Sequence, residues 1–262
     1  MVTTMDGDAA VHERRHVLQD LGWEIASVGD ERHGQATVVA EMHVPGTPHL
    51  RTSILAVWAD VVAGYLAVDT IGPRVPVTLD LDVHLYRPAP GAGTVRGTAK
   101  IVKSGRSVFV AEVDFSDQEG EVFGFAAASF VPAPDATLSI TTLTSPNPVA
   151  PTKSRLTVPF AERAGCARVA PGVAELTHSE EKLNASNTVN GGLIALAVEE
   201  AMLSLLPGAT VSSLDMRYLQ PARIGPVVAR AEVRDGLGRV QVRDEGNDNR
   251  LCVVATSRFF GA

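Results

Sequence analysis

The chain has 262 residues, of which 45% are hydrophobic and 20% are charged, the balance of an ordinary globular protein. Its net charge of −7 argues against a general nucleic-acid surface, because phosphate binding favours a basic face. Its first residues show neither the basic nor the apolar region of a signal peptide, and no apolar run reaches the about 18–20 residues of a membrane span. We therefore expect a cytoplasmic protein with no membrane span, and this length accommodates two domains of about 130 residues each.

Metal and cofactor chemistry find little support in the sequence. Cys166 and Cys252 are the only two cysteines, and their spacing indicates neither a disulfide framework nor a metal site. Residues 12–16 read HERRH, which formally matches the zinc-protease pattern HExxH. We interpret it as a solvated helical turn within 12–20, because it lies near the N-terminus with two arginines where that motif has apolar neighbours. No GxSxG or phosphate-binding loop is present, so we expect no metal and no cofactor.

The sequence pattern of the first half predicts two strands, a helix and four further strands. The first two strands lie at 23–29 and 35–42, around a polar loop at 30–34. A loop with two prolines then leads into an apolar helix, together residues 45–62, whose single carboxylate is Asp60. The next strand, 75–88, has apolar residues alternating with polar ones, which is typical of a half-buried strand: Val75, Val77, Leu79, Leu81, Val83 and Leu85. Tight turns separate the last three strands, at 94–105, 106–117 and 121–132.

A linker rich in Pro, Thr and Ser then separates two domains, which we place at 1–134 and 156–262 with the linker at 135–155. The second domain repeats the order of the first: strand-like segments on either side of 170–171, an Asn- and Gly-rich loop, a helix, and strands that begin at 211, 227, 239 and 251. The chain is therefore predicted to be an internal duplication.

The two predicted helices align without gaps. Residues 54–60, ILAVWAD, fall on residues 193–199, LIALAVE, so that apolar residues coincide and Asp60 pairs with Glu199. The segments LYRPAPG and YLQPARIG match after the helices. The loops before the helices differ, since the second half has Asn184, Asn190 and Gly191 where the first has Pro45, Arg51 and Thr52.

The stretch NASNTVNGGLIALAVEEA (184–201) has the pattern of a site. Its asparagines favour turns and N-caps, and Gly191 and Gly192 leave the N–H groups of the first helical turn uncovered for a ligand carbonyl. The helix that follows is almost wholly apolar, so Glu199 and Glu200 are costly unless paired or used. Because consecutive helical positions point about 100° apart, we expect only one of them to face the core.

A long apolar helix wrapped by an antiparallel sheet, preceded by Asn-x-x-x-x-x-[His/Asn]-Gly-Gly and carrying an acid nine positions after the His/Asn, resembles the hotdog-fold acyl-CoA thioesterases of the phenylacetate and hydroxybenzoyl-CoA type. Two copies resemble a double hotdog, an α+β fold in which the halves pair as an intrachain pseudo-dimer. The resemblance implies that the Gly191 N–H polarises the thioester carbonyl, that a carboxylate attacks it or activates water, and that Asn184 orients the participants. Asn190 stands where many members have His, and neither acid is followed one turn later by Thr or Ser, since Gly64 and Leu203 occupy those positions.

The distance between Gly191 and Glu199 along their helix decides which acid we expect to be catalytic. Gly191 and Glu199 lie about 12 Å apart along one helix axis, so one carbonyl cannot touch both. We therefore predict a crossed site of Asp60 from the first half with Asn184, Asn190 and Gly191 from the second, and treat Glu199 as the alternative acid. Three arginines near strand ends are the candidates for coenzyme A phosphates: Arg87, Arg217 and Arg223.

Three functions remain open on sequence. The first is hydrolysis of an acyl-CoA or a related acyl thioester. The second is a hotdog hydratase or dehydratase, which would require a catalytic His, and the loops before the helices offer only His49. The third is a non-catalytic acyl-CoA-binding protein, since one of the two sites is degraded. We expect an acyl thioester as partner, no nucleic acid, and a homo-oligomer of double-hotdog chains; acyl length and the choice between coenzyme A and a carrier protein stay open.

Overall fold

The structure is a computed structural model that describes residues 16–135, 137, 139 and 153–261. The first half contains η1 (Val17–Leu21), β1 (Glu24–Val28), β2 (Glu31–Thr37), η2 (Ala40–Met42), α1 (Thr52–Ile71), β3 (Pro76–Leu85), β4 (Thr94–Ser104), β5 (Phe109–Ser116) and β6 (Val122–Pro132). The second half contains α2 (Phe160–Arg163), β7 (Cys166–Ala170), β8 (Val173–Leu176), η3 (Glu180–Lys182), α3 (Gly191–Leu205), β9 (Val211–Tyr218), β10 (Val227–Arg234), β11 (Leu237–Asp244) and β12 (Arg250–Phe259).

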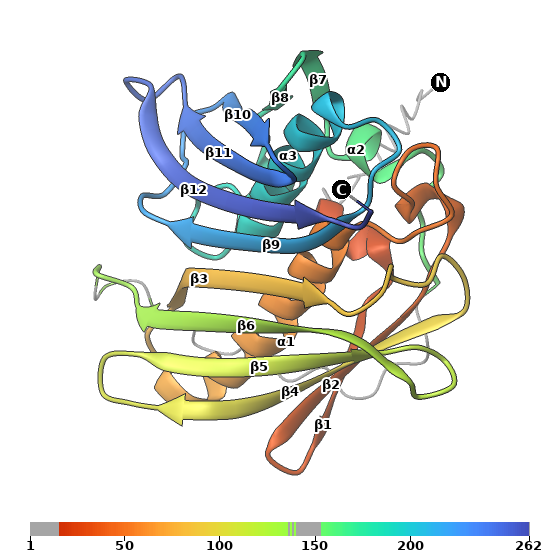
Figure 1. Cartoon of the computed structure of the whole chain (residues 1–262). Coiled ribbons are helices and arrows are strands. Elements are labelled where there is room, and N and C mark those ends of the chain that lie inside the picture. Colours follow the sequence, from red (N-terminus) through yellow and green to blue (C-terminus); the bar gives the residue numbers. More distant parts are fainter. Residues whose placement is uncertain (1–15, 136, 138, 140–152, 262) are drawn as a thin grey trace, which may run out of the picture.

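All twelve strands form one antiparallel sheet in the order β1-β2-β4-β5-β6-β3-β9-β12-β11-β10-β8-β7. The halves join where β3 pairs with β9, with Leu81 opposite Met216. The sheet curves around α1 and α3, which lie on its same side and pack against each other (Figure 1). This arrangement confirms the predicted double hotdog with joined sheets and adjacent helices.

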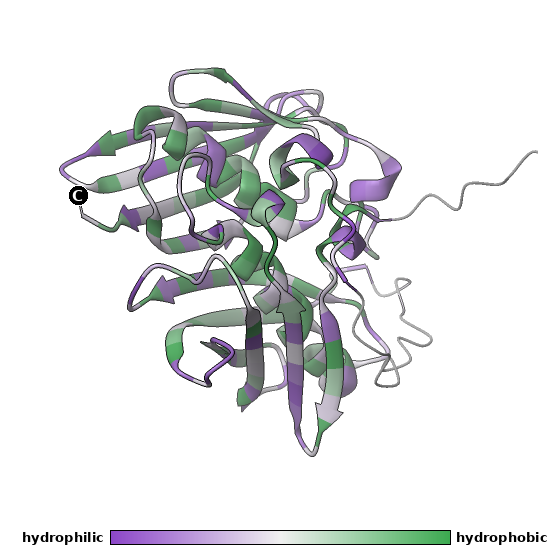
Figure 2. Cartoon of the chain, turned by 90° about the vertical axis from the view of Figure 1, so that its right-hand side faces the viewer, coloured by the Kyte–Doolittle hydropathy of each residue, from purple (hydrophilic) through white to green (hydrophobic). Residues whose placement is uncertain are grey.

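The core lies between the sheet and the two helices. Strands present alternating hydrophobic and hydrophilic bands, as Figure 2 shows, so one face of each strand is buried against the helices. By length and composition alone α1 is apolar enough to span a membrane, but 56% of its most apolar window is buried inside the fold. The two helices thus serve as the shared centre of both halves.

The structure departs from the sequence-based expectations at four places. Residues 31–34 belong to β2 rather than to a loop, residues 40–42 form η2 rather than the end of a strand, and residues 160–163 form a helical turn rather than a strand. The fourth is in β3, whose register shifts between Thr78 and Asp80, so that Leu79 is 40% exposed rather than buried. Of the HERRH segment, only His16 is among the described residues, where it caps η1. Most of the predicted linker, residues 140–152, lies outside the described residues.

Candidate active site

The first turn of α3 presents one free backbone donor. Asn190 is the N-cap residue, and its Oδ1 accepts a hydrogen bond from the Gly192 N–H at 2.8 Å. Within the described part of the chain, the Gly191 N–H has no hydrogen-bond acceptor. A helix N-terminus carries partial positive charge and unsatisfied N–H groups, so this donor is suited to a carbonyl oxygen.

Two close approaches surround this turn, the first between the halves and the second within the second half. A Cβ on Gly192 would lie 2.9 Å from Val57 Cα, so a side chain there would prevent α1 and α3 from meeting. A Cβ on Gly191 would lie 3.0 Å from the hydroxyl oxygen of Tyr218, which donates a hydrogen bond to the Gly191 carbonyl at 3.0 Å. Asp60 follows Val57 by about one helical turn, and the crossed arrangement thus places it beside the start of α3.

Asp60 is partly buried, and among the described residues its carboxylate has one hydrogen-bonding partner, Thr78. Burial raises the pKa of its carboxyl to about 6, and the hydrogen bond from Thr78 Oγ1, 2.7 Å long, opposes that shift. The irregularity in β3 turns Thr78 toward the helix, since a β-bulge re-aims side chains. Burial raises the pKa of Tyr218 well above its usual value, and the nearby charge of Asp60 adds to this effect, so the phenol stays neutral and able to donate.

The twin position at the start of α1 is closed by Glu199. Its Oε1 accepts hydrogen bonds from the backbone N–H groups of Thr52 at 2.9 Å and Ser53 at 3.3 Å. Its Oε2 accepts from Ser53 Oγ at 2.6 Å and from Arg51 at 3.1 Å. Glu199 is fully buried and Arg51 is 1% exposed, so no room is left there for a ligand.

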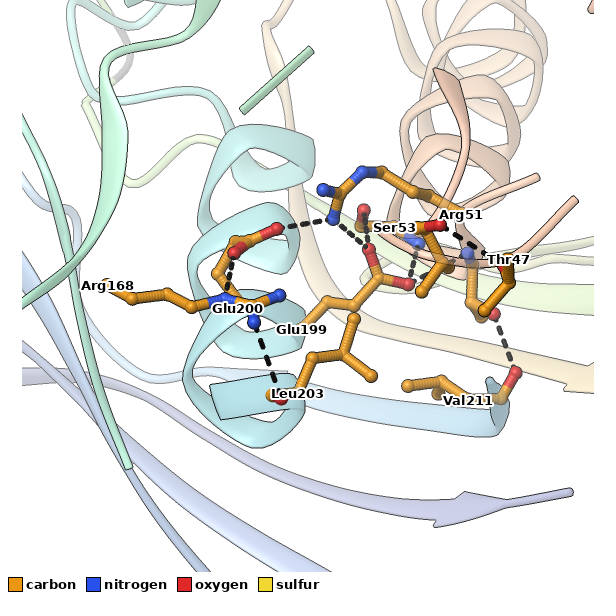
Figure 3. A network of polar contacts seen from close by, with 10 residues as sticks. Thr47, Arg51, Ser53, Arg168, Glu199, Glu200, Leu203 and Val211 are labelled. Atoms are coloured by element: carbon orange, nitrogen blue, oxygen red, sulfur yellow. Dashed lines mark hydrogen bonds and ion pairs between the residues drawn. The ribbon is translucent and has the colours of Figure 1, made fainter. Parts of the chain in front are cut away.

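Glu200 extends the closed network (Figure 3). It lies 2.6 Å from Arg51 and accepts a hydrogen bond from Arg168 at 2.6 Å. The expectation that only one of the two glutamates faces the core is therefore wrong, because both are buried. The physical reason is that Arg51 and Arg168 bring positive charge to both carboxylates, which offsets the desolvation cost of burying them.

Known proteins resemble this chain in fold. The model of the thioesterase superfamily matches residues 51–123, and no curated protein sequence matches the chain. An acyl-ACP thioesterase from Bacteroides thetaiotaomicron is 15% identical, with a TM-score of 0.61 over 88% of this chain and 98% of its own. A 12:0-ACP thioesterase from Umbellularia californica is 14% identical, with a TM-score of 0.64 over 89% and 98%. The chain has the double-hotdog fold of the thioesterase superfamily.

In this double hotdog, the other predicted site residues lie as follows. Asn184 is exposed, and its Oδ1 accepts hydrogen bonds from the Ser186 N–H at 2.9 Å and from the Thr188 N–H at 3.2 Å. Its side chain therefore shapes its own loop. Asn190 acts as the cap of α3. Asp60 and Gly191 are linked through Tyr218, whose hydroxyl bonds the Gly191 carbonyl and whose pKa the nearby charge of Asp60 raises. Their catalytic roles stay predictions.

The three arginines lie at different places in the double hotdog. Arg223 donates to the Ser186 carbonyl at 3.3 Å, so it borders the loop before α3. Arg217 pairs with Asp80 at 3.3 Å and also with Asp82. Arg87 pairs with Asp117 at 2.7 Å, beyond the end of β3 opposite to Thr78. Only Arg223 is placed next to the predicted site, and its role toward phosphate stays a prediction.

Two residues of the site were missed on sequence. Thr78 lies in an alternating strand that assigns it to the outer face, and nothing in that pattern signals the irregularity after it. Tyr218 does carry a signal, because it is a lone tyrosine at an inward position that aligns with Leu85 of the first half. As for metals, the described residues contain no group of three or more His, Cys, Asp or Glu side chains able to hold one.

Proposed function

We propose that the protein hydrolyses acyl thioesters, acyl-CoA in the first place, to the free acid and the thiol. The observation that carries the proposal has two parts: the Gly191 N–H at the start of α3 has no acceptor among the described residues, and Tyr218, whose hydroxyl bonds the Gly191 carbonyl, lies near enough to the partly buried Asp60 for that carboxylate to raise its pKa. The similarity in fold to two acyl-ACP thioesterases supports this reaction class. Both of those proteins are named for acyl-ACP thioesters, so a carrier-protein thioester is the substrate to test beside acyl-CoA.

The chemistry begins at the thioester carbonyl. Its oxygen accepts the Gly191 N–H, where the helix dipole and a preorganised donor stabilise the negative charge that develops. Asp60, with a pKa of about 6, is ionised at pH 7 and removes a proton from water, whose oxygen bonds to the carbonyl carbon. The tetrahedral intermediate then collapses, the carbon–sulfur bond breaks, and the thiolate leaves and takes up a proton.

Direct attack by Asp60 is the second route to the same products. The carboxylate oxygen bonds to the carbonyl carbon, the thiolate leaves, and water hydrolyses the resulting anhydride. In both routes Tyr218 has a positioning role, because its hydroxyl holds the Gly191 carbonyl at 3.0 Å and thereby fixes the turn that carries the donor.

A hydratase or dehydratase fits the site less well. That chemistry would use a histidine at the start of the helix, where the open site has Asn190. His49 precedes α1, whose N-terminus is occupied by Glu199. A non-catalytic acyl-CoA-binding protein remains the second candidate, because Glu199 closes one of the two crossed positions.

Steady-state thiol release from acyl-CoA, followed with a thiol reagent, tests the proposal. Asp60→Asn should lower turnover at least ~100-fold, the scale of a lost general base, whereas Glu199→Gln should change turnover per folded molecule far less. The opposite order would make Glu199 the catalytic acid. Loss of acyl-CoA without release of thiol by the wild type would instead point to hydration or binding.

A further inference from the structure

A strip of α1 just beyond Asp60 is only partly covered by the described residues. Four residues on it are partly exposed although none carries a charge: Val61, Gly64, Tyr65 and Val68. Their spacing places them along one side of the helix. In α3, by contrast, every residue from Gly192 to Leu203 is buried. The exposed strip is therefore a property of the half that supplies the acid of the open site.

The residues of α3 that align with this strip are covered by other parts of the chain. Leu203, which aligns with Gly64, is 1% exposed. Around it, Arg168 of β7 pairs with Glu200, and the Gly172 N–H donates to Ser204 Oγ at 2.7 Å. The β7–β8 hairpin thus covers α3 along the side that stays open on α1.

Gly64 leaves real space at this point. A Cβ added there would meet no described atom outside its own helix within 4 Å except one ring carbon of Phe130, at 3.9 Å. Gly192, in the first turn of α3, offers no such space, since its Cβ would lie 2.5 Å from a Val57 methyl group. The room for a side chain therefore lies one helical turn beyond the acid.

We propose that the acyl group of the substrate lies over Gly64 along the strip formed by Val61, Gly64, Tyr65 and Val68, and that the protein acts on thioesters of uncharged, apolar acyl groups. This rests on the proposed function. A carbonyl held between Gly191 and Asp60 has its acyl carbons at the start of the strip. From Asp60 to Val68 the helix rises about 12 Å, which accommodates an extended chain.

The chemistry of the strip selects against charged acyl groups. A second carboxylate, as in a dicarboxylic acyl group, would lie beside Asp60 without a positive partner on the strip, and burying an unpaired charge is costly. Burial raises the pKa of the Tyr65 phenol, so that side chain stays neutral. The next charged residue along the helix is Asp69, which pairs with Arg32.

Replacing Gly64 by leucine tests the proposal, because it rebuilds the side chain that α3 has at the twin position. Hydrolysis of a series of acyl-CoAs from acetyl to palmitoyl is measured by thiol release. The wild type should favour the longer chains, and Gly64→Leu should lower kcat/KM for them about tenfold or more while acetyl-CoA changes less than about twofold. Gly64→Ala should give a smaller loss of the same kind.

Thr70→Leu is the matched control, since it places the same leucine side chain on another, exposed side of the same helix, and its chain-length profile should equal that of the wild type. Leucine and alanine favour helices more than glycine does, so thermal stability should not fall. Equal losses at all chain lengths, or none, would overturn the proposal.

A binding measurement separates failure of the proposed hydrolysis from failure of the proposed acyl strip. If the wild type hydrolyses none of the series, binding of a non-hydrolysable palmitoyl-CoA ether is measured by calorimetry in the same variants. Weaker binding by Gly64→Leu, with Thr70→Leu unchanged, would support the acyl strip in a binding protein. Unchanged binding in both variants would overturn the strip as well.

Discussion

The two crossed positions of this fold share their geometry and differ in what occupies the helix N-terminus. At both, the acid stands nine positions after the cap residue of its own helix, Arg51 for Asp60 and Asn190 for Glu199. Glu199 uses its reach to bind the N–H groups of Thr52 and Ser53 directly. For Asp60, whose side chain is one methylene shorter, no such bond to α3 is found in the described residues. At the closed position the backbone N–H donors of the first turn therefore bind Glu199, whereas at the open position the Gly191 N–H is left for a ligand.

The surroundings of the two acids follow the same division. Asn190, Gly191 and Gly192 of the open position align with Arg51, Thr52 and Ser53 of the closed one. Thr78 in β3 and Val211 in β9 each precede a register shift, but only Thr78 offers a hydroxyl to an acid. One copy thus keeps a helix N-terminus whose Gly191 N–H has no acceptor among the described residues, and the other became a buried network that joins the halves.

Removing the carboxylate from the closed position should have the largest effect on stability. Glu199→Ala leaves Arg51 and two backbone N–H groups without their main partner in the core, and breaking a buried ion pair costs about 3–5 kcal/mol. Denaturant unfolding measures the loss. The two tryptophans stack with ring centroids 4.5 Å apart in the first half, so their fluorescence reports that half while circular dichroism reports the whole chain.

Added acetate provides the control for this variant. The vacated position would offer a small carboxylate the Thr52 and Ser53 N–H groups and Arg51, and a ligand that binds only the folded state stabilises it. Acetate should therefore raise the unfolding midpoint of Glu199→Ala more than that of the wild type. Equal responses of the two proteins would contradict the assignment of Glu199 as an internal occupant of the helix N-terminus.

Asp60→Asn should increase the stability of the folded protein at neutral pH, whereas Glu199→Ala should decrease it. The pKa of Asp60 rises from 3.8 to about 6 on folding, so the folded carboxyl binds its proton more tightly, and wild-type stability falls as pH rises between those values. The variant lacks this loss and should be more stable by about 2–3 kcal/mol at pH 7. Near pH 4 the difference should vanish. Unfolding curves at both pH values check this, and a variant less stable at pH 7 would mean that the charge of Asp60 is compensated.

The sequence predicted much of this because the duplication repeats physical patterns. Alternating strands and aligned apolar helices were enough to predict the double hotdog. The distance from Gly191 to Glu199 along one helix led to the crossed site, which stays a prediction. The burial of Glu200 and the position of Thr78 could not be predicted. Glu200 depends on Arg51 and Arg168, which lie far from it in sequence, and Thr78 depends on an irregularity that leaves no mark in the alternation.

Tyr218→Phe should have a moderate effect at the open position only. The phenyl ring keeps the volume against Gly191, but the hydrogen bond to the Gly191 carbonyl is lost, and such a bond contributes about 0.5–1.5 kcal/mol. We expect turnover to fall about two- to tenfold while KM changes little, since the donor is misaligned rather than removed. Steady-state kinetics measure both constants. Leu85→Met, a conservative change at the twin position, is the control and should leave both unchanged.

Thr78→Val should have the smallest effect on activity at neutral pH. Its effect at acidic pH is the more informative one. The Thr78 hydroxyl donates to Asp60 at 2.7 Å and favours its charged form, so removing it raises the pKa of Asp60 further above about 6. Because the ionised carboxylate is the base, the acid limb of the kcat/KM profile should move to higher pH, with activity near pH 6 reduced several-fold and activity near pH 8 almost unchanged. Thr78→Ser keeps the hydroxyl and should retain the wild-type limb. A uniform loss at all pH values in Thr78→Val would show that Thr78 supports packing instead of the ionisation of Asp60.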